Sequence, residues 1–366
     1  MKKYLTNTIS LIVLIGLVFV LPIVIEFGKW LYLFRSCLIL LLFVEIIRLM
    51  KKIFYDENIP KTKSYVLFGA PLLCLLLVIE FTFMFIPYSH GVGYTYGARI
   101  WSEIYWSKNS NGFRDKEPSN ITSTILFVGD SFTAGHGIKD INDRFSNLLS
   151  QQLKSYGCIN IGRNGADTDA EFKTMVNFLD DTNIIPKFIV LQYFGNDIKR
   201  MAQKSGLLFK RNKPYDDLNY FGEILVRGSF LINYLYWLFP HSDATPYLDF
   251  FTRAYSDSTI FNNQLNSIDK FVNYSEENDI ELIVVVFPIM THLKLSQSIY
   301  VDKVLAHLKK RGISTINVSR YLGNLNPRDL VVNKNDGHCS VKVHKIVANK
   351  LKDIIEKNEK WLQQGD

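Results

Sequence analysis

Cysteine is scarce in this sequence, with four residues among 366. Two of them, Cys37 and Cys74, fall within long apolar runs, which leaves Cys158 and Cys339 for the rest of the chain. That number is too small for a fold built on disulfides, although it leaves a Cys158–Cys339 bridge open. No C-x-x-C pair and no histidine–cysteine cluster occurs, so we predict no metal site and no cofactor.

A marked excess of one charge is also missing. The 42 lysines and arginines face 35 acidic residues, a formal net charge of +7. Of this excess, +4 lies in residues 1–90 and only +3 in residues 91–366. A nucleic-acid partner would require a basic face on the scale of a domain, so we expect none. The apolar fraction of 48% with 21% charged residues excludes a disordered or fibrous chain.

Long apolar runs fill the first ninety residues. The first run has no charge over 9–25, about the length that crosses a hydrocarbon core. The second contains Arg35 and Glu45 near its ends, where we expect both side chains to reach the interfaces. In the third, we expect a tilted helix that brings Glu80 near the interface; a functional intramembrane carboxylate is the alternative. We therefore predict a transmembrane region over 1–88 with about three helices, at 9–26, 30–47 and 64–87, followed by a connector at 89–120.

Basic residues indicate the orientation of these helices. The loop between the second and third runs carries five of them, whereas the first hairpin offers only one: Arg48, Lys51, Lys52, Lys61 and Lys63 against Lys29. Because basic loops stay in the cytoplasm, we predict that the N-terminus is inside and the chain after about residue 89 is outside. A cleaved signal peptide is the alternative for the first run, but no small-x-small cleavage site follows it.

After the membrane region, short apolar runs alternate with amphipathic patterns. This alternation is typical of a parallel sheet covered by helices, so the predicted fold class is α/β, with three layers (α/β/α) around a five-stranded parallel sheet. The expected strands are 125–128, 159–161, 188–193, 282–287 and 315–318. The expected helices are 143–156, 169–179, 260–274, 297–311 and 341–356.

Polar residues follow these strands where a ligand crevice would lie, at the carboxyl ends. They are Gly129-Asp130-Ser131 after the first strand, Gly165 after the second, Gly195-Asn196-Asp197 after the third and Asp336-Gly337-His338 before the last helix. Each group alone is commonplace in turns. In chain order they supply a nucleophile, oxyanion donors, a base and a carboxylate to orient that base.

These four groups resemble the four blocks of the SGNH/GDSL hydrolase superfamily, over about residues 121–358. The resemblance implies that Ser131 is the nucleophile, His338 the general base and Asp336 its orienting carboxylate. It also implies an oxyanion hole formed by the Ser131 and Gly165 N–H groups and the Asn196 side chain. Supporting roles fall to Asp130, Gly195 and Asp197.

The chain departs from the family pattern in three places. After the histidine, Cys339-Ser340 replaces the usual proline or asparagine. Phe132 replaces the leucine of the GDSL name, and Asp336 lies two residues before the histidine, whereas many members place the aspartate three before, at the position of Asn335. The segment Asn109–Asp115 resembles one found before the first block in membrane-attached members. We assign it no role.

Two further histidines and one cysteine lie near these blocks, and of these His344 and Cys339 are interpreted as structural. His136 lies in a turn five residues after Ser131 and has no geometric claim as the base. His344 falls on the closing helix, and Cys339 is expected to be a small buried residue. An aromatic-rich insertion at 198–258, with a helix expected at 221–239, could be a lid, could pack at the membrane near the third span, or could be a core helix, the commonest of the three.

The function that follows is a membrane-anchored serine esterase acting outside the cytoplasm. Its expected substrates are esters of cell-envelope carbohydrate or lipid, including acetyl esters, and its expected place is a bacterial cytoplasmic membrane with the catalytic domain outside. An O-acyltransferase that uses the same acyl-enzyme on a polysaccharide is the first alternative. A catalytically silent binding or assembly module is the second, although all the catalytic side chains are present.

Overall fold

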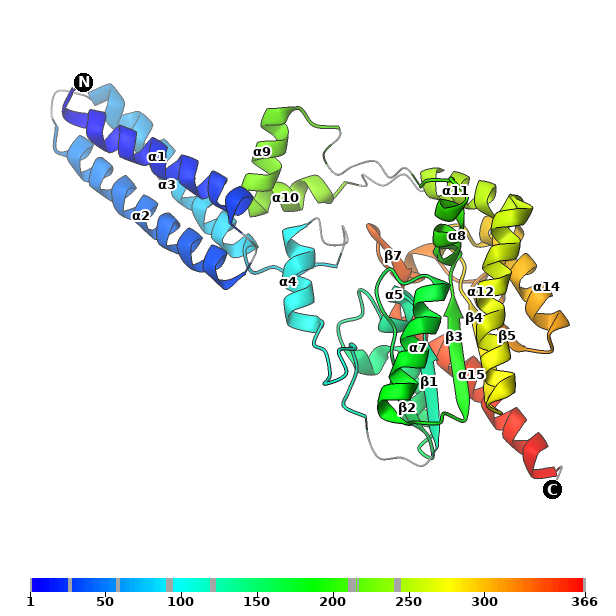
Figure 1. Cartoon of the computed structure of the whole chain (residues 1–366). Helices are drawn as coiled ribbons and strands as arrows, with labels where there is room; N and C mark the ends of the chain where they lie inside the picture. The colour runs from blue at the N-terminus through cyan, green and yellow to red at the C-terminus, as the bar shows by residue number, and fades with distance from the viewer. Residues whose placement is uncertain are drawn as a thin grey trace. The chain divides into compact units, whose positions relative to one another are not determined.

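The computed structural model describes residues 2–25, 28–56, 60–89, 95–118, 123–209, 215, 217–239 and 245–364. The chain folds into two units, each assembled from two separate stretches of sequence (Figure 1). The first unit consists of residues 1–104 and 212–241, and the second of residues 105–211 and 242–366. The chain therefore leaves the second unit in the middle of its sequence and returns to it.

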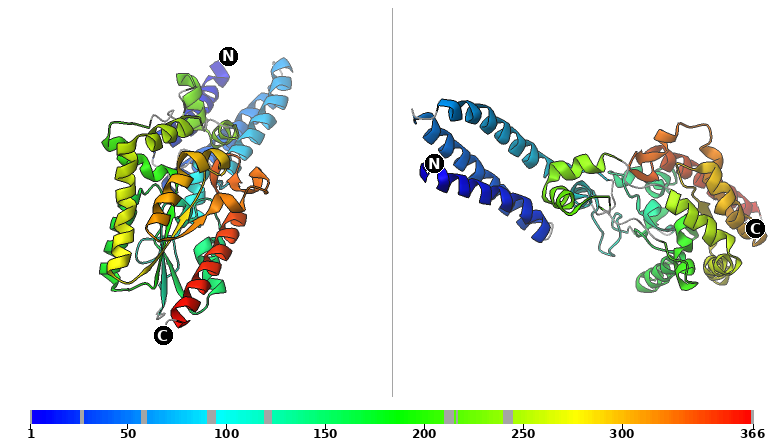
Figure 2. Two further views of the ribbon diagram at one scale, coloured as in Figure 1. Left: turned by 90° about the vertical axis from the view of Figure 1, so that its right-hand side faces the viewer. Right: turned by 90° about the horizontal axis from the view of Figure 1, so that it is seen from above.

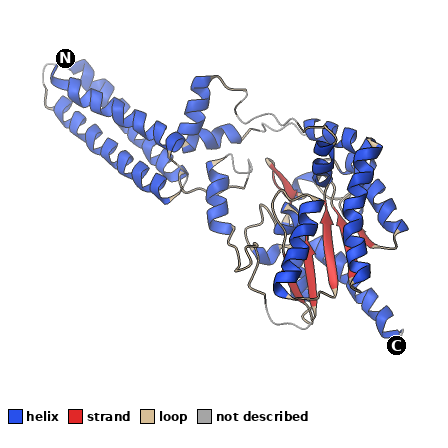
Figure 3. Cartoon of the chain, in the orientation of Figure 1, coloured by secondary structure: helices blue, strands red, loops and turns tan. Residues whose placement is uncertain are grey.

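A parallel sheet of five strands forms the centre of the second unit (Figure 3). Its order is β2-β1-β3-β4-β5, and every neighbouring pair is parallel. This is the strand order of flavodoxin-like folds, and each strand lies within two residues of its predicted range. The strands are β1 (Thr124–Val128), β2 (Gly157–Asn160), β3 (Phe188–Tyr193), β4 (Glu281–Val286) and β5 (Ser314–Asn317).

Helices cover both faces of this sheet (Figure 2). Because side chains alternate along a strand, Leu126, Leu191 and Val284 face one side, while Phe127, Val190 and Val285 face the other. The first face packs against α7 (Thr168–Thr182), α12 (Ser258–Glu277) and α14 (Asp302–Lys310). The second packs against α6 (Phe145–Gln152) and α15 (Val341–Gln364). The predicted three-layer α/β/α fold is confirmed.

The expected helix over 297–311 has a more complex form. It is built from α13 (Leu293–Ser296), a π-helical turn at Gln297–Val301, and α14. Two short strands, β6 (Val331–Asn333) and β7 (Asp336–Cys339), form a separate antiparallel pair just before α15. The sequence pattern did not predict this pair, which carries two of the candidate site residues.

The order of the sheet reverses at β1. From β1 the chain moves outward to the edge strand β2, and then crosses back to β3 on the other side of β1. Ligand crevices of open α/β sheets lie at such a reversal, outside the carboxyl ends of the strands. The loops after β1, β2 and β3 all begin there.

Long helices form most of the first unit. They are α1 (Lys2–Val24), α2 (Lys29–Phe54) and α3 (Pro60–Phe83), followed by α4 (Tyr96–Tyr105). Within the described residues, two stretches are long and apolar enough to cross a membrane, 6–24 and 29–54, while the apolar stretch Phe68–Phe83 is shorter. Many large apolar side chains on these helices are exposed, among them Ile12, Leu40 and Phe68.

The aromatic-rich insertion differs from the prediction. The helix expected at 221–239 is two helices, α9 (Tyr220–Gly228) and α10 (Phe230–Trp237), because Ser229 is extended (φ −128°) and its hydroxyl caps α10 by accepting the N–H of Ile232. Both helices belong to the first unit, where α9 packs on α1 and α10 on α3. Of the three interpretations, packing near the third span matches these contacts. The flanking parts of the insertion, with α8 (Lys199–Lys204) and α11 (Thr245–Ser256), stay in the second unit.

Candidate active site

Ser131 stands directly after β1, at the first residue of the short helix α5 (Ser131–Ala134). Asp130 caps this helix: its carboxylate accepts the N–H of Phe132 at 2.9 Å. The chain turns at the end of α5, where the N–H of His136 donates to the carbonyl of Ser131 at 2.8 Å. The serine is thereby fixed at the carboxyl end of β1, the first strand in the sequence, where the sequence pattern places it.

Gln192 is a structural support of this loop that the sequence analysis missed. It is fully buried near the end of β3, and its side-chain oxygen accepts the N–H of Asp130 at 3.1 Å and of Thr133 at 3.3 Å, together with the Thr133 hydroxyl at 3.0 Å. The loop of the nucleophile is therefore tied to the neighbouring strand. A polar residue within the otherwise apolar run FIVLQY was the signal that could have revealed it.

His338 and Asp336 come from a much later part of the sequence than Ser131, but the fold brings them beside it. The Ser131 hydroxyl lies 2.8 Å from Nε2 of His338, and Nδ1 of His338 lies 2.5 Å from Oδ1 of Asp336. Both residues are on β7, and side chains at i and i+2 of a strand point to the same face. The strand explains why an aspartate two residues before the histidine meets its Nδ1, whereas Asn335 would point the other way.

The charges of this pair stabilise one another. Burial alone would raise the pKa of Asp336, but the imidazolium of His338 and its hydrogen bonds outweigh burial and hold that pKa below its usual value. Burial would likewise lower the pKa of His338, but the Asp336 carboxylate, its hydrogen bond and Asp130 raise it above 6.5. Asp336 therefore makes His338 more basic, as a proton acceptor for Ser131 must be.

Asn196 lies in a 3₁₀ turn, Gly195–Ile198, that follows β3. Its amide nitrogen donates to Oδ2 of Asp130 at 3.2 Å, which brings it beside the loop of Ser131. Asp197 accepts the N–H of Phe194 at 3.0 Å, and burial followed by the charge of Asp130 raises the pKa of Asp197 well above its usual value. Gly195 packs closely, since a Cβ there would come within 2.9 Å of the Tyr300 ring.

Gly165 lies in the turn after β2 with a left-handed backbone (φ +71°), a conformation that glycine adopts at little cost. Its neighbours connect this turn to the loop of Ser131. The N–H of Arg163 donates to the carbonyl of Gly129 at 3.0 Å, and the Asn164 amide lies 3.3 Å from Nδ1 of His136. The structure thus gathers all the predicted site segments at one edge of the sheet.

His136 is closer to the site than the sequence analysis expected. Its ring centre lies 4.5 Å from that of His338, and its Nε2 lies 3.8 Å from Oδ2 of Asp336. The left-handed glycines on either side fold the turn back over Ser131 (φ +73° at Gly135 and +82° at Gly137), and this brings His136 beside Asp336. Asp336 therefore lies between two imidazoles. His136 is not the base, since it is His338 that contacts the serine.

The same three side chains could also offer ligands to a metal ion, because one atom of each lies within 4.8 Å of the others. However, His338 already uses both ring nitrogens, one toward Asp336 and one toward Ser131. A metal would have to displace one of these hydrogen bonds. The observed geometry fits a proton relay better than a ligand set.

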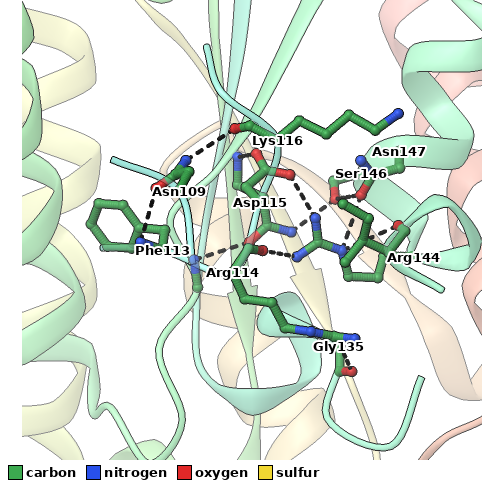
Figure 4. A network of polar contacts seen from close by, with 12 residues as sticks. Asn109, Phe113, Arg114, Asp115, Lys116, Gly135, Arg144, Ser146 and Asn147 are labelled. Atoms are coloured by element: carbon green, nitrogen blue, oxygen red, sulfur yellow. Dashed lines mark hydrogen bonds and ion pairs between the residues drawn. The ribbon is translucent and has the colours of Figure 1, made fainter. Parts of the chain in front are cut away.

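The segment Asn109–Asp115, to which no role could be assigned from the sequence, holds the turn around Gly135 in place (Figure 4). The buried guanidinium of Arg114 donates to the carbonyls of Ala134, Gly135 and Ile138 at 3.1, 2.6 and 2.5 Å. Burial and the nearby charge of Arg144 lower the pKa of Arg114 to about 9. Arg114 therefore acts as a clamp on the backbone that follows the nucleophile.

Arg144 and Asp115 complete this clamp. Arg144 donates to Oδ1 of Asp115 at 2.6 Å and to the carbonyl of Arg114, while Oδ2 of Asp115 accepts the N–H of Asn160 at 2.8 Å, at the end of β2. Figure 4 shows the guanidinium group of Arg144 beside Asp115 and that of Arg114 beside Gly135. The segment thus connects the loops that follow β1 and β2.

His344 and Cys339 are structural, as predicted. His344 is fully buried, its Nδ1 accepts the N–H of Phe145 at 3.1 Å, and its Nε2 lies 3.3 Å from the sulfur of Cys339. Burial and the charges of Arg144 and Arg114 lower the pKa of His344 to about 3, so it is neutral at physiological pH. Both Cys158 and Cys339 are free thiols, so the bridge that the sequence left open does not form.

No protein-family model and no curated protein match this chain. GDSL-type lipolytic proteins are among the solved structures that are similar to it. A member of the lipolytic protein G-D-S-L family from Veillonella parvula has 10% identity and a TM-score of 0.39, with 64% of this chain and 98% of that chain covered. For the lipase/acylhydrolase from Enterococcus faecalis, the values are 11% and 0.38, with 65% and 97% covered. For an acetyl xylan esterase, they are 13% and 0.39, with 63% and 99% covered. Similarity at this level does not extend the activity of those proteins to this chain.

Proposed function

We propose that this chain is a serine esterase of the SGNH type. The observation that carries the proposal is the continuous path from the Ser131 hydroxyl through His338 to Asp336, with separations of 2.8 and 2.5 Å. A nucleophile, a base and a group that orients the base, within hydrogen-bond reach of one another, are the requirement for nucleophilic catalysis by serine. They lie at the edge of the sheet where ligands of such folds bind.

The reaction follows from this geometry. Nε2 of His338 takes the hydroxyl proton as Ser131 Oγ bonds to the ester carbonyl carbon, and the carbonyl oxygen becomes negative. We assign the backbone N–H groups of Ser131 and Gly165 and the Asn196 amide to that oxygen. When the intermediate collapses, the bond to the alcohol breaks and His338 returns its proton to the leaving oxygen. Water then releases the acyl group from Ser131 by the same steps.

We assign α1, α2 and α3 to a membrane anchor. Two of these helices have the length and composition of membrane spans, and the third carries a shorter apolar stretch. The basic residues Arg48, Lys51 and Lys52 mark the end of α2 that would face the cytoplasm, so the catalytic domain would lie on the outer face. Esters of cell-envelope carbohydrate or lipid, acetyl esters included, are the substrates available to such an enzyme.

The test uses the purified full chain in detergent with p-nitrophenyl acetate. Wild type should release nitrophenol and become labelled at Ser131 by a fluorophosphonate, while Ser131→Ala should lose both the label and the turnover, by about 10⁴-fold or more. Ser298→Ala, which removes an exposed hydroxyl, is the matched control. A folded Ser131→Ala variant with wild-type turnover would refute the assignment.

A parallel reaction with an oligosaccharide acceptor distinguishes the hydrolase from an acyltransferase. Acyl transfer to the sugar in place of water would assign the chain to the transferases. The absence of any Ser131-dependent reaction with any donor would leave a binding or assembly module.

A further inference from the structure

The first unit contains a buried ion pair that none of the proposed chemistry uses. Arg35 on α2 is fully buried and Glu80 on α3 is 8% exposed, and the two side chains form a salt bridge. The sequence analysis expected both to approach a membrane interface separately. They turn inward instead, because each finds partners on the insertion.

These partners are the two helix ends at the α9–α10 junction. Arg35 donates to the carbonyl of Gly228, the last residue of α9, at 3.0 Å, and to the carbonyl of Val18 on α1 at 2.8 Å. Glu80 accepts the N–H groups of Phe230 and Leu231, the first two residues of α10, at 2.7 and 3.0 Å. The cation therefore lies at a helix C-terminus and the anion at a helix N-terminus, the arrangement that helix dipoles favour.

Two further contacts fix the junction on the bundle. The Ser229 hydroxyl donates to Glu80 at 2.6 Å. Gly228 lies so close to α1 that a Cβ there would come within 2.6 Å of the carbonyl oxygen of Phe19. The junction is thus held by α1, α2 and α3 together.

The position of the ion pair along the bundle gives the depth of the junction. Arg35 lies six residues from the start of α2, Val18 six from the end of α1 and Glu80 three from the end of α3, all at the same end of the bundle. At about 1.5 Å per residue, the junction lies roughly 5–9 Å inside that end. Amphipathic helices that bind in the plane of a membrane bury their apolar face by about 5–10 Å.

The outer surfaces of α9 and α10 have the composition of such helices. Tyr220 and Phe221 on α9 are 81% and 67% exposed, and Leu235 on α10 is 46% exposed. The rings of Tyr236 and Trp237 meet edge to face, with centroids 5.4 Å apart. Tyrosine and tryptophan are the residue types that concentrate at the level of lipid headgroups. Residues 212–241 carry two basic and three acidic side chains, so general attraction to anionic lipid does not explain binding.

We propose that α9 and α10 form a lipid-embedded surface in the outer leaflet, and that the Arg35–Glu80 pair sets its depth. This inference rests on the proposed membrane anchor. Its partner is the boundary between headgroups and acyl chains of a bilayer. A segment of chain that begins only 16 residues after Asn196 is thereby fixed to the membrane.

The experiment measures depth by spin labelling of the full chain in phosphatidylcholine vesicles, with the native cysteines replaced by alanine. Labels at Phe221→Cys and Leu235→Cys are compared with Phe34→Cys on α2 and with Ile185→Cys on the second unit, both exposed positions. We expect the labels at Phe221→Cys and Leu235→Cys to collide more with oxygen than with a water-soluble nickel chelate, as at Phe34→Cys. The label at Ile185→Cys should collide more with the chelate. If Phe221→Cys and Leu235→Cys match Ile185→Cys while Phe34→Cys favours oxygen, the inference is wrong and the anchor stands. If Phe34→Cys also favours nickel, both fail.

A second arm tests the ion pair. Glu80→Gln should move both labels on the insertion toward the Ile185→Cys value and leave Phe34→Cys unchanged, whereas Glu45→Gln, in a more exposed pair with Arg48, should change neither. The exchange Arg35→Glu with Glu80→Arg should not restore the depth, because each charge would then meet the wrong helix end. Unchanged labels in Glu80→Gln, or full rescue by the exchange, would contradict the role given to the pair.

Discussion

The two units each bury a carboxylate against a cation, but the two pairs differ in what their cation can do. In the second unit, Asp336 holds His338, which changes charge near neutral pH. In the first unit, Glu80 holds Arg35, and an arginine stays protonated over the whole range in which histidine titrates. A buried carboxylate can therefore serve proton transfer when it is paired with a histidine, and permanent attachment when it is paired with an arginine.

The largest expected effect comes from Asp336→Asn, which breaks the titratable pair. We expect kcat/KM for p-nitrophenyl acetate to fall about 10⁴-fold. Asp336 raises the pKa of His338, and only neutral His338 accepts a proton, so wild-type activity should rise with pH through a midpoint above 6.5. In the variant that midpoint should move to lower pH. The measurement is kcat/KM from pH 5 to 9.

Asp329→Asn is the control for this prediction, because Asp329 is an exposed acid paired with Lys342. Near-UV circular dichroism establishes that both variants are folded. An unmoved midpoint in Asp336→Asn would show that the carboxylate does not act on His338.

The pairing also makes stability depend on pH with a definite sign. Because the pKa of His338 is raised on folding, its contribution is fully present below pH 6.5 and is lost as pH rises through the folded pKa. The lowered pKa of Asp336 makes its contribution present above about pH 4 and lost as pH falls through the folded value. Urea unfolding of wild type and Asp336→Asn at pH 6 and pH 9 should show a smaller difference at pH 9.

Arg35→Met breaks the permanent pair and leaves Glu80 buried without its cation. Removing one partner of a buried ion pair costs about 3–5 kcal/mol, so the first unit should unfold at a clearly lower temperature in detergent. Hydrolysis of a soluble ester below that temperature should be unchanged, since no residue of the relay is touched. Thermal unfolding by tryptophan fluorescence measures the effect, with Arg48→Gln, whose side chain is exposed, as the control. Equal melting temperatures in the two variants would count against a stabilising role.

Asn196→Ala tests the oxyanion donor without changing either pair. Loss of one such donor costs about 3–4 kcal/mol of barrier, a fall of 10²–10³ in kcat. The pH midpoint should stay where it is in wild type, in contrast to Asp336→Asn. A fall in kcat together with a shifted midpoint would mean that Asn196 acts instead through Asp130, to which it donates a hydrogen bond.

The smallest expected effect is that of His136→Gln. The imidazole lies 3.8 Å from the free oxygen of Asp336 and lowers the pKa of that carboxylate. Couplings between neighbouring groups are about 0.5–3 kcal/mol. Because 3.8 Å is longer than a hydrogen bond, we expect a coupling in the lower half of that range and a fall in kcat/KM of about tenfold or less. Gln151→Ala, on the surface of α6, is the control. A loss as large as that of Asp336→Asn would make His136 a part of the relay.

The sheet and the positions of the site residues along it could be predicted from the sequence because both depend on local patterns. Strand β3 matches its prediction in both ends, and Ser131, Asn196 and Asp336 follow or lie near elements with clear apolar periodicity. Arg35 and Glu80 could not be paired in this way. They are separated by 45 residues, and their further partners lie about 150 residues beyond, so only the folded bundle brings them together.

His136 and Gln192 show the same limit on a smaller scale. The sequence places each of them correctly, one in a turn and one in a strand. Their contacts depend on the curvature of that turn and on the facing loop, which no spacing rule describes. The clamp of Arg114 is similar, because it binds backbone carbonyls that carry no signature of their own.

The interrupted second unit has a practical consequence for producing the catalytic domain alone. Deleting residues 1–104 would remove α1 to α4 but leave 212–241 in the chain, where Gly228, Ser229 and Phe230 would lose the groups that bury them. The apolar surface exposed on these residues would favour self-association of the fragment. A soluble fragment therefore needs two excisions, one at the N-terminus and one that joins residue 211 to residue 242 through a flexible linker.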